Sequence, residues 1–554
     1  MWRDSLPAKA DQALKALGAD ISPFGQIGRY SVRREFDGAS VFLTGATGFI
    51  GSLVVELLLR TTDVARIYVL ARGKRGASAS ERVLRLLHSG LFHSVRDSPE
   101  LLAKVTVMEG DMTMDDLGLG PADQATLAAD VHFVIHAASI IELEADVQRT
   151  LRGNYLGTKR LLLLAGRMQR LRAFVYISAA HANVNAEAGA SVDEIIYPLY
   201  FGHQEVDHSS LVEDLMSLTP ESANVRAQMY LDMWGFPNNY TLGKNLTEKL
   251  VAQFFYGGLP AAIVRPSMVC GVAGAPYPGY SGSLAGPGGQ ALAQAVGFYD
   301  NLDSFAMVPT NIWDVVPGDM VSSVVVASAA AVSAHAHIDG YDDAARGGGP
   351  CSAGSMGMGN GLAAAGSMEL GGVGPLIVHA ATSTTYPISY VESQWASLAY
   401  IAGNPPPFRL PGAELFKVPL DFRPDPAKVD RAKRNTAWKV WFAIKVLETL
   451  GQHKTARRLK WGHIAWDVQN NAKTDRNLFF TTKNLLALEG QLEAAESGDY
   501  MMSWTLRRGG WPRYIATTLA GMYRQIFGIT RVEGPIDHDF AFIPSRERSR
   551  SAAP

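Results

Sequence analysis

Tyr240 and Lys244 lie four residues apart in the segment NNYTLGKNLTEKL. This spacing places both side chains on one face of a helix. An ammonium group beside a phenol stabilises the phenolate, so we expect the pKa of Tyr240 to fall from its ordinary value of about 10. Tyr240 can then give a proton to a carbonyl oxygen as a nicotinamide cofactor delivers hydride, while Lys244 also holds the ribose hydroxyls. The pair predicts a catalytic site for carbonyl reduction.

Such a pair usually works with a hydroxyl group beside the substrate oxygen, and the segment FVYISAAHANVN supplies one. Ser178 is the available hydroxyl, so it is the third predicted catalytic residue. His181 lies close behind and can donate a hydrogen bond, although a single histidine at a strand end is more often structural. Asn154, in RGNYLGTKRLLLLA, is expected on a helix that lines the same site. It suits a water-held proton relay or, alternatively, satisfies buried backbone groups.

The segment VFLTGATGFIG carries three glycines with two residues between each pair. We expect a strand to end at Thr44 and a helix to start near Phe49, so that backbone N–H groups and the helix dipole converge on a pyrophosphate. Gly45 permits the tight turn, Gly48 lets the backbone approach the phosphates, and Gly51 lets the helix pack closely. The residues of this turn that we assign to the cofactor are Gly45, Thr47, Gly48, Phe49, Ile50 and Gly51.

The next strand of the pattern, RIYVLARGKRG, ends at Arg72, where a carboxylate would be expected for NAD. A guanidinium there, supported by Lys74, pairs instead with the 2′-phosphate of NADP, so NADPH is the favoured cofactor. The alternative is an exposed basic loop without a ligand. Further cofactor contacts are predicted at Asp111 near the adenine, at the small residues Ala137 and Ala138, and at Asn154, Pro266, Tyr240 and Lys244.

These residues need a scaffold, and the alternation of apolar strands with helical patterns between residues 39 and about 270 predicts one. Strands of nearly continuous hydrophobicity indicate a doubly wound parallel α/β sheet of the Rossmann type. We expect a substrate subdomain beside it and a helical domain at the C-terminal end. The expected organisation is an N-terminal extension (1–38), the NADP-binding domain (39–332), a Gly/Ala/Met-rich disordered insertion (333–374), a return to the first domain (375–404), the helical domain (405–530) and a tail (531–554).

Composition excludes several classes of protein. The 51 basic and 53 acidic residues give a net charge of −2, so nothing marks a nucleic-acid partner. The two cysteines have no metal-ligand spacing, which predicts no metal site and favours an intracellular, reducing compartment. The first 38 residues show no apolar stretch of signal-peptide length. The longest apolar run, residues 321–334, is shorter than the roughly 20 residues that span a bilayer, so a soluble or peripheral protein is expected.

Several segments together resemble the alcohol-forming fatty acyl-CoA reductases, the male-sterility-protein family of extended short-chain dehydrogenases. They include VFLTGATGFIGSLVVELLLR, IYVLARGKRGASASERVLRLL, EGDMTMDDLGL, FPNNYTLGKNLTEKLV and LPAAIVRPSMVCG. The resemblance implies NADPH-dependent reduction of a long-chain acyl-CoA, through an aldehyde, to a fatty alcohol, with CoA leaving as a thiol. It also implies catalytic roles for Tyr240 and Lys244.

The chain departs from that family's pattern after the Ser178 strand. The family usually has Ser-Thr-Ala-Tyr there, and this chain has SAAH, so Ala179 occupies the position of the catalytic threonine. Either Ser178 or His181 substitutes, or activity is lowered, because a missing hydrogen bond to a developing oxyanion costs on the order of 3 kcal/mol. Three alternatives stay open: a reductase that stops at the aldehyde, another extended dehydrogenase acting on a sterol or sugar nucleotide, and a non-catalytic NADP-binding protein.

The segment AWKVWFAIKVLETL interleaves Trp438, Trp441 and Phe442 with Lys439 and Lys445. At helical spacing this makes an apolar face beside cations, which could cap a lipid-binding cleft or rest on an anionic membrane surface. The alternative is an amphipathic helix whose aromatic face is turned to the core and whose lysines are solvated.

Overall fold

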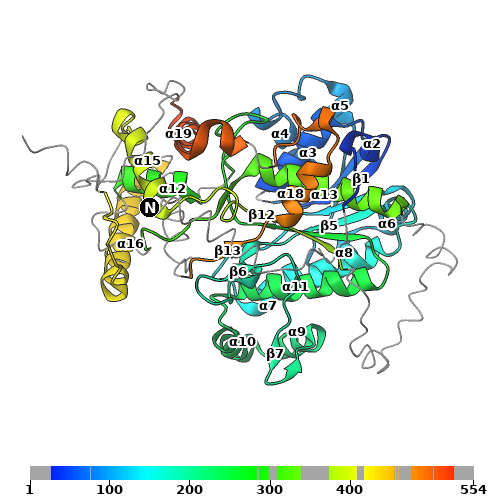
Figure 1. Cartoon of the computed structure of the whole chain (residues 1–554), viewed down its shortest axis with the longest axis horizontal. Coiled ribbons are helices and arrows are strands. Elements are labelled where there is room, and N and C mark those ends of the chain that lie inside the picture. Colours follow the sequence, from blue (N-terminus) through cyan, green and yellow to red (C-terminus); the bar gives the residue numbers. More distant parts are fainter. Residues whose placement is uncertain are drawn as a thin grey trace, which may run out of the picture.

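A parallel seven-stranded sheet forms the centre of the protein (Figure 1). The computed structural model describes residues 27–74, 76–282, 286–297, 308–338, 374–407, 417–453, 456, 460, 476–502 and 505–529. The strands, in their order across the sheet, are β12 (Leu376–Ala380), β9 (Ala261–Pro266), β5 (Ala173–Ile177), β4 (Phe133–His136), β1 (Ser40–Thr44), β2 (Arg66–Ala71) and β3 (Val105–Glu109). The order reverses between β1 and β4, where a doubly wound sheet binds its ligand. The expected fold class is confirmed.

Helices cover both faces of the sheet, because successive side chains of a strand point to opposite sides. In β1, Val41 and Leu43 enter one apolar cluster and Phe42 enters the other. The first face is covered by α2 (Val32–Phe36), α3 (Phe49–Thr61), α4 (Ala79–Leu87), α5 (Pro99–Ala103), α13 (Gly318–Ile338) and α18 (Lys483–Gln491). The second is covered by α6 (Pro121–Asp130), α7 (Val147–Leu151), α8 (Gly157–Ala165), α9 (His208–Ser217), α10 (Pro220–Trp234) and α11 (Asn239–Tyr256).

Helix α13 lies in the core between the sheet and its neighbours. Within the described residues it is the one helix long and apolar enough to cross a membrane by length and composition. The apolar window Gly318–His335 is 89% buried inside the fold, as expected for a core helix. Residues 333–338, which the sequence assigns to the insertion, belong instead to this helix, and the buried Ser333 hydroxyl donates to Glu35 at 2.7 Å. Residues 339–373 of the predicted insertion lie outside the described residues.

The start of the described chain packs against α18 and the segment that follows it, on the first face of the sheet. The backbone N–H of Val32, at the start of α2, donates to the carboxylate of Glu496 at 2.8 Å, and the Tyr30 hydroxyl donates to the Leu488 carbonyl at 2.9 Å. Residues 27–38 therefore belong to the core of the first domain, although the sequence assigns them to an extension. The C-terminal segment near α18 belongs to that core too, because Leu485 and Leu488 are fully buried in it.

A third apolar cluster gathers helices at one end of the molecule (Figure 1). Its members are α12 (Gly286–Val296), α15 (Tyr390–Gly403), α16 (Pro426–Thr449), α19 (Thr505–Phe527) and the short parallel pair β10 (Met268–Cys270) and β11 (Val315–Pro317). Helices from the expected C-terminal domain thus share one core with helices from the middle of the chain. Among the described residues of the range 405–530, α16 and α19 belong to this cluster and α18 belongs to the first domain, whereas the sequence predicts one separate helical domain.

Helix α16 has two apolar faces. Val429 and Val440 are buried against the third cluster, with 5% and 1% of their surface exposed. Trp438, Trp441 and Phe442 point the other way, with 65%, 57% and 53% exposed. The interpretation of this segment as a helix with its aromatic face turned to the core is therefore wrong, because smaller residues fill the core side.

Candidate active site

The glycine turn lies between β1 and α3, at the carboxyl end of β1. Gly45 has φ +78°, and a Cβ there would lie 2.6 Å from the backbone of Ala137 and Ala138. A Cβ on Gly51 would lie 2.2 Å from the Gly45 carbonyl oxygen, whereas one on Gly48 would lie 3.1 Å from it. Gly45 and Gly51 are thus fixed by backbone packing, and Gly48 begins α3 without a side-chain cap, which leaves its N–H groups for a ligand. The turn fits a dinucleotide pyrophosphate.

A basic corner follows β2. The Arg72 guanidinium pairs with the Asp111 carboxylate at 2.7 Å and is 57% exposed. Partial burial raises the pKa of Asp111, but hydrogen bonds from Thr113 and the Arg72 charge lower it more, so Asp111 stays ionised. Arg82, from α4, donates to the Thr47 hydroxyl at 2.9 Å and also to the Arg72 carbonyl. Lys74 is exposed in the turn beside them. The corner suits a phosphate group next to the glycine turn.

The segment after β4 closes the glycine turn from the other side. The N–H groups of Ala137 and Ala138 donate to the carbonyl and the hydroxyl of Thr44, at 3.1 and 3.3 Å. Asn154 lies in a π-helical turn, Arg152–Leu156, and is buried. Its amide accepts from the Ile140 N–H at 2.7 Å and donates to the Ile140 carbonyl at 2.9 Å. Asn154 therefore satisfies backbone groups, which is the structural alternative expected for it, and it holds this segment in place.

Tyr240 and Lys244 lie in the first turns of α11, which begins after the side chain of Asn238 caps the Thr241 N–H. The Lys244 ammonium nitrogen donates to the Ile177 carbonyl, at the end of β5, at 2.8 Å, and it lies 6.0 Å from the centre of the Tyr240 ring. The structure thus brings the helix pair to the end of the strand that precedes Ser178.

The pKa values of this pair differ from the expectation. Burial raises the pKa of Tyr240 to about 12, so the predicted lowering is wrong for this structure. The reason is that the Lys244 ammonium faces the strand end and the ring face of Tyr176, 4.7 Å away. Burial also lowers the pKa of Lys244 to about 7, against the opposing charge of Glu248. Lys244 therefore changes charge near neutral pH.

Ser178 follows β5, and its N–H donates to the Val264 carbonyl of β9 at 2.8 Å. Its hydroxyl is buried near the Tyr176 hydroxyl. Ala179 is 8% exposed and adds no polar group. His181 packs edge-on against Phe480 at 5.7 Å, and burial lowers its pKa, so it is neutral near pH 7. Pro266 ends the next strand and pairs with Ala380 of β12.

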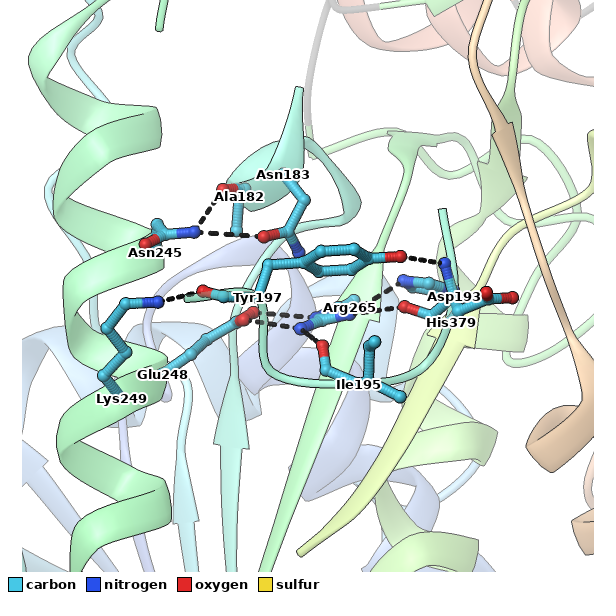
Figure 2. A network of polar contacts seen from close by, with 10 residues as sticks. All are labelled: Ala182, Asn183, Asp193, Ile195, Tyr197, Asn245, Glu248, Lys249, Arg265 and His379. Carbon is cyan, nitrogen blue, oxygen red and sulfur yellow. Dashed lines mark hydrogen bonds and ion pairs between the residues drawn. The ribbon is translucent and has the colours of Figure 1, made fainter. Parts of the chain in front are cut away.

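A buried charged network holds α11 in place (Figure 2). The Arg265 guanidinium, fully buried in β9, donates to both carboxylate oxygens of Glu248 at 2.9 and 2.7 Å. It also donates to the backbone carbonyls of Asp193 and Ile195 at 3.1 and 2.6 Å. Lys249, next to Glu248, donates to the carbonyl of Tyr197. The network ties the helix of Tyr240 to the segment 193–197.

Two further groups extend this network. Asn245 donates to the Ala182 carbonyl and the Asn183 side chain at 3.2 and 3.0 Å, which fixes the segment after Ser178 (Figure 2). Glu194 accepts from the N–H groups of His379 and Asn484 at 2.9 and 2.8 Å. Burial raises the pKa of Glu194 to about 8, although these two N–H groups lower it.

Arg82, Glu248 and Arg265 are functional residues of this site that the sequence pattern did not predict. A signal existed for two of them. Glu248 follows Lys244 by four residues on the same helical face, and Arg265 is a charged residue inside an apolar strand, which requires a buried partner. For Arg82 the sequence offers only one arginine among several in α4.

A doubly wound sheet, a glycine turn at its switch point and a Tyr-x-x-x-Lys helix define a dinucleotide-binding protein of the extended short-chain dehydrogenase type. The family model for Male sterility protein, an NAD-binding domain, matches residues 43–325. The chain belongs to this family and has a fold for a nicotinamide cofactor. Within the described residues, no group of three or more His, Cys, Asp or Glu is placed to hold a metal ion.

The relatives include fatty acyl-CoA reductase 2 of Mus musculus, 33% identical over 53% of this chain and 54% of that protein. Fatty acyl-CoA reductase 1 of Xenopus laevis is 32% identical over 54% of this chain and 56% of that protein. The chain thus matches about half the length of these relatives.

Among solved structures, the terminal R domain from the myxalamid PKS-NRPS biosynthetic pathway has the same fold. The TM-score is 0.51 at 18% identity, covering 89% of this chain and 92% of that one. The reductase domain of a non-ribosomal peptide synthetase from Mycobacterium tuberculosis also reaches 0.51, at 16% identity, over 94% and 96% of the two chains.

Proposed function

We propose that this protein is an NADPH-dependent fatty acyl-CoA reductase that converts a long-chain acyl-CoA, through an aldehyde, to a fatty alcohol. The observation that carries the proposal is the position of the Tyr240–Lys244 helix at the carboxyl end of β5, on the same edge of the parallel sheet as the glycine turn, in a chain of this family. The named relatives support the acyl-CoA substrate. The balanced reaction consumes two NADPH and two protons and releases free CoA.

The proposed roles follow from the chain's own groups. When bound, NADPH supplies hydride to the carbonyl carbon. Tyr240, which keeps its proton because its pKa is raised, gives that proton to the carbonyl oxygen. Lys244 supplies positive charge beside it, and the buried Ser178 hydroxyl offers a hydrogen bond to the same oxygen.

NADPH is proposed over NADH because of the basic corner. Arg82 donates to Thr47 of the glycine turn and to the Arg72 carbonyl, so the guanidinium groups of Arg82 and Arg72 would bind the 2′-phosphate. Asp111 orients Arg72 through its ion pair.

The test is purified protein with NADPH and an acyl-CoA series, with products extracted and identified. Tyr240→Phe should lower the rate by about 10²–10⁴-fold, because the proton donor is lost. Tyr256→Phe, at the exposed end of the same helix, is the matched control and should be unchanged. Undiminished alcohol formation by Tyr240→Phe would overturn the assignment, and aldehyde as the sole product would restrict the activity to the first reduction.

Ala179 favours a competing proposal, a protein that binds NADPH without turnover. The side chain at this position adds no hydrogen bond to the substrate oxygen. Ala179→Thr separates the two proposals, since it should increase the turnover of an enzyme and leave a non-catalytic protein inactive. NADPH binding without oxidation by any acyl-CoA, in both variants, would support the second proposal.

A further inference from the structure

The outward side of α16 carries a continuous apolar stripe, formed by Trp438, Trp441, Phe442, Val446 and Leu450, which we name the α16 outer face. Their exposed fractions are 65%, 57%, 53%, 41% and 65%. The rings of Trp438 and Phe442 stack at 5.8 Å, so the exposed surface is an ordered aromatic platform. Single exposed apolar residues are ordinary, but a stripe of five on one helix indicates a binding surface.

Basic residues share this face. Arg434 precedes Trp438 by four residues and Lys445 follows it by seven, so helical geometry places both beside the aromatic side chains, and both are exposed. Arg431, seven residues before Trp438, extends the row. The whole helix has six basic and two acidic residues. Lys445 also pairs with Glu448 at 3.4 Å. The stripe is therefore an apolar surface whose border carries a net positive charge.

We propose that the α16 outer face docks onto an anionic lipid bilayer. Tryptophan and phenylalanine with bordering lysine or arginine are the residues that place a helix in the plane of a membrane interface, where rings enter the headgroup region and cations meet anionic headgroups. A second copy of this chain fits less well, because a symmetric contact would bring the basic residues of one α16 outer face against the basic residues of the other. This inference stands on the surface of α16 and does not rest on the proposed reaction.

A second exposed apolar stripe, on α10, allows the effect of the basic border on lipid binding to be separated from that of apolar exposure. Val225, Met229 and Met233 on α10 are spaced by four residues and are 67%, 56% and 57% exposed. Their exposure matches that of the α16 residues, but α10 carries one arginine against two acidic residues. The rings of Tyr230 and Trp234 on α10 also stack, at 5.2 Å, but both are partly buried against the second cluster. The α10 stripe itself holds no aromatic residue and has no basic border, so it serves as the control.

The test measures flotation of the full chain with vesicles of phosphatidylcholine alone or with added phosphatidylserine. Wild type should bind the anionic vesicles at least about tenfold more tightly, since each cation near the surface contributes about fivefold. Trp438→Ser/Trp441→Ser/Phe442→Ser should lose this binding, and Val225→Ser/Met229→Ser/Met233→Ser should retain it. Arg434→Glu/Lys445→Glu should lose only the preference for anionic lipid.

Three results would overturn the proposal: equal binding by the aromatic variant, equal loss in the α10 variant, or a dimer that dissociates when the aromatics are replaced. Circular dichroism and reduction of a short-chain acyl-CoA in vesicle-free solution serve as folding controls. If wild type reduces no acyl-CoA of any chain length while vesicle binding holds, the proposed function fails and the lipid surface stands.

Discussion

The two halves of the sheet's carboxyl edge differ in the groups that form them, which are backbone groups in one half and charged side chains in the other. The nucleotide half, around Gly45, Gly48 and Gly51, is made of backbone groups whose spacing leaves no room for a Cβ at Gly45 or Gly51. The reaction half, around β5, β9 and α11, is made of buried charged side chains, with Lys244, Glu248 and Arg265 all at most 2% exposed. Backbone packing therefore determines the structure of the first half, and buried charge pairs determine the structure of the second.

This difference predicts how each half responds to change. In the nucleotide half, cofactor affinity should fall when a side chain is added at a glycine. It should not change with pH near neutrality, because the contacts that form this half are backbone packing contacts. The reaction half should be sensitive to the loss of one charge and to pH, because each buried ion depends on its partner. Four experiments examine this comparison.

The largest expected effect is on the buried ion pair. Arg265→Met leaves Glu248 without its partner, and breaking a buried pair costs about 3–5 kcal/mol of unfolding free energy. Denaturant unfolding measures this cost. The double variant Arg265→Met/Glu248→Leu is the control and should recover a substantial part of it, since no unpaired charge remains. A single variant as stable as wild type would show that charge does not govern this half.

The next effect concerns the glycine turn. Gly51→Ala drives a Cβ to 2.2 Å from the Gly45 carbonyl oxygen, so the helix must shift, at a cost of roughly 1–3 kcal/mol. NADPH affinity, measured by fluorescence titration, should fall accordingly. Gly48→Ala, whose Cβ would lie 3.1 Å from the Gly45 carbonyl oxygen, should lower the free energy of unfolding less than Gly51→Ala does. Equal stability of the two variants would contradict the packing argument.

The pH dependence of turnover should report Lys244. Because burial lowers its pKa to about 7, Lys244 is charged below that pH and neutral above it. The contribution of the Lys244 charge to turnover is therefore present at low pH and is lost as the pH rises through about 7. Above that pH, kcat/KM should fall by up to about tenfold per pH unit. Lys244→Arg keeps its charge and should flatten this limb. A flat wild-type profile between pH 6 and about 9 would refute the assignment.

The smallest effect is expected at the basic corner. Arg72 is exposed and Arg82 is half-buried, so in the proposed function each would contribute a partly screened contact to the 2′-phosphate. Arg82→Ala should weaken NADPH binding by about five- to tenfold and leave NADH binding unchanged. Arg85→Ala, on the same helix, is the matched control. A parallel loss for both cofactors would remove Arg82 from the 2′-phosphate site.

The sequence by itself determined what local patterns encode. The alternation of strands and helices gave the sheet, the end of β1 at Thr44 and the start of α3 at Phe49 fell where expected, and Tyr240 and Lys244 share a helical face. These features depend on residues close together in the chain, so spacing and residue type are sufficient to predict them.

Only the tertiary structure decided the features that join distant segments. It placed Glu496 at the start of α2 and Glu248 against Arg265, and it turned Trp438 outward while Val440 fills the core. It also set the pKa of Tyr240, because burial outweighs a lysine whose charge faces a strand end. The physical reason is that burial and partner choice depend on what packs against a side chain, and that neighbour can be hundreds of residues away.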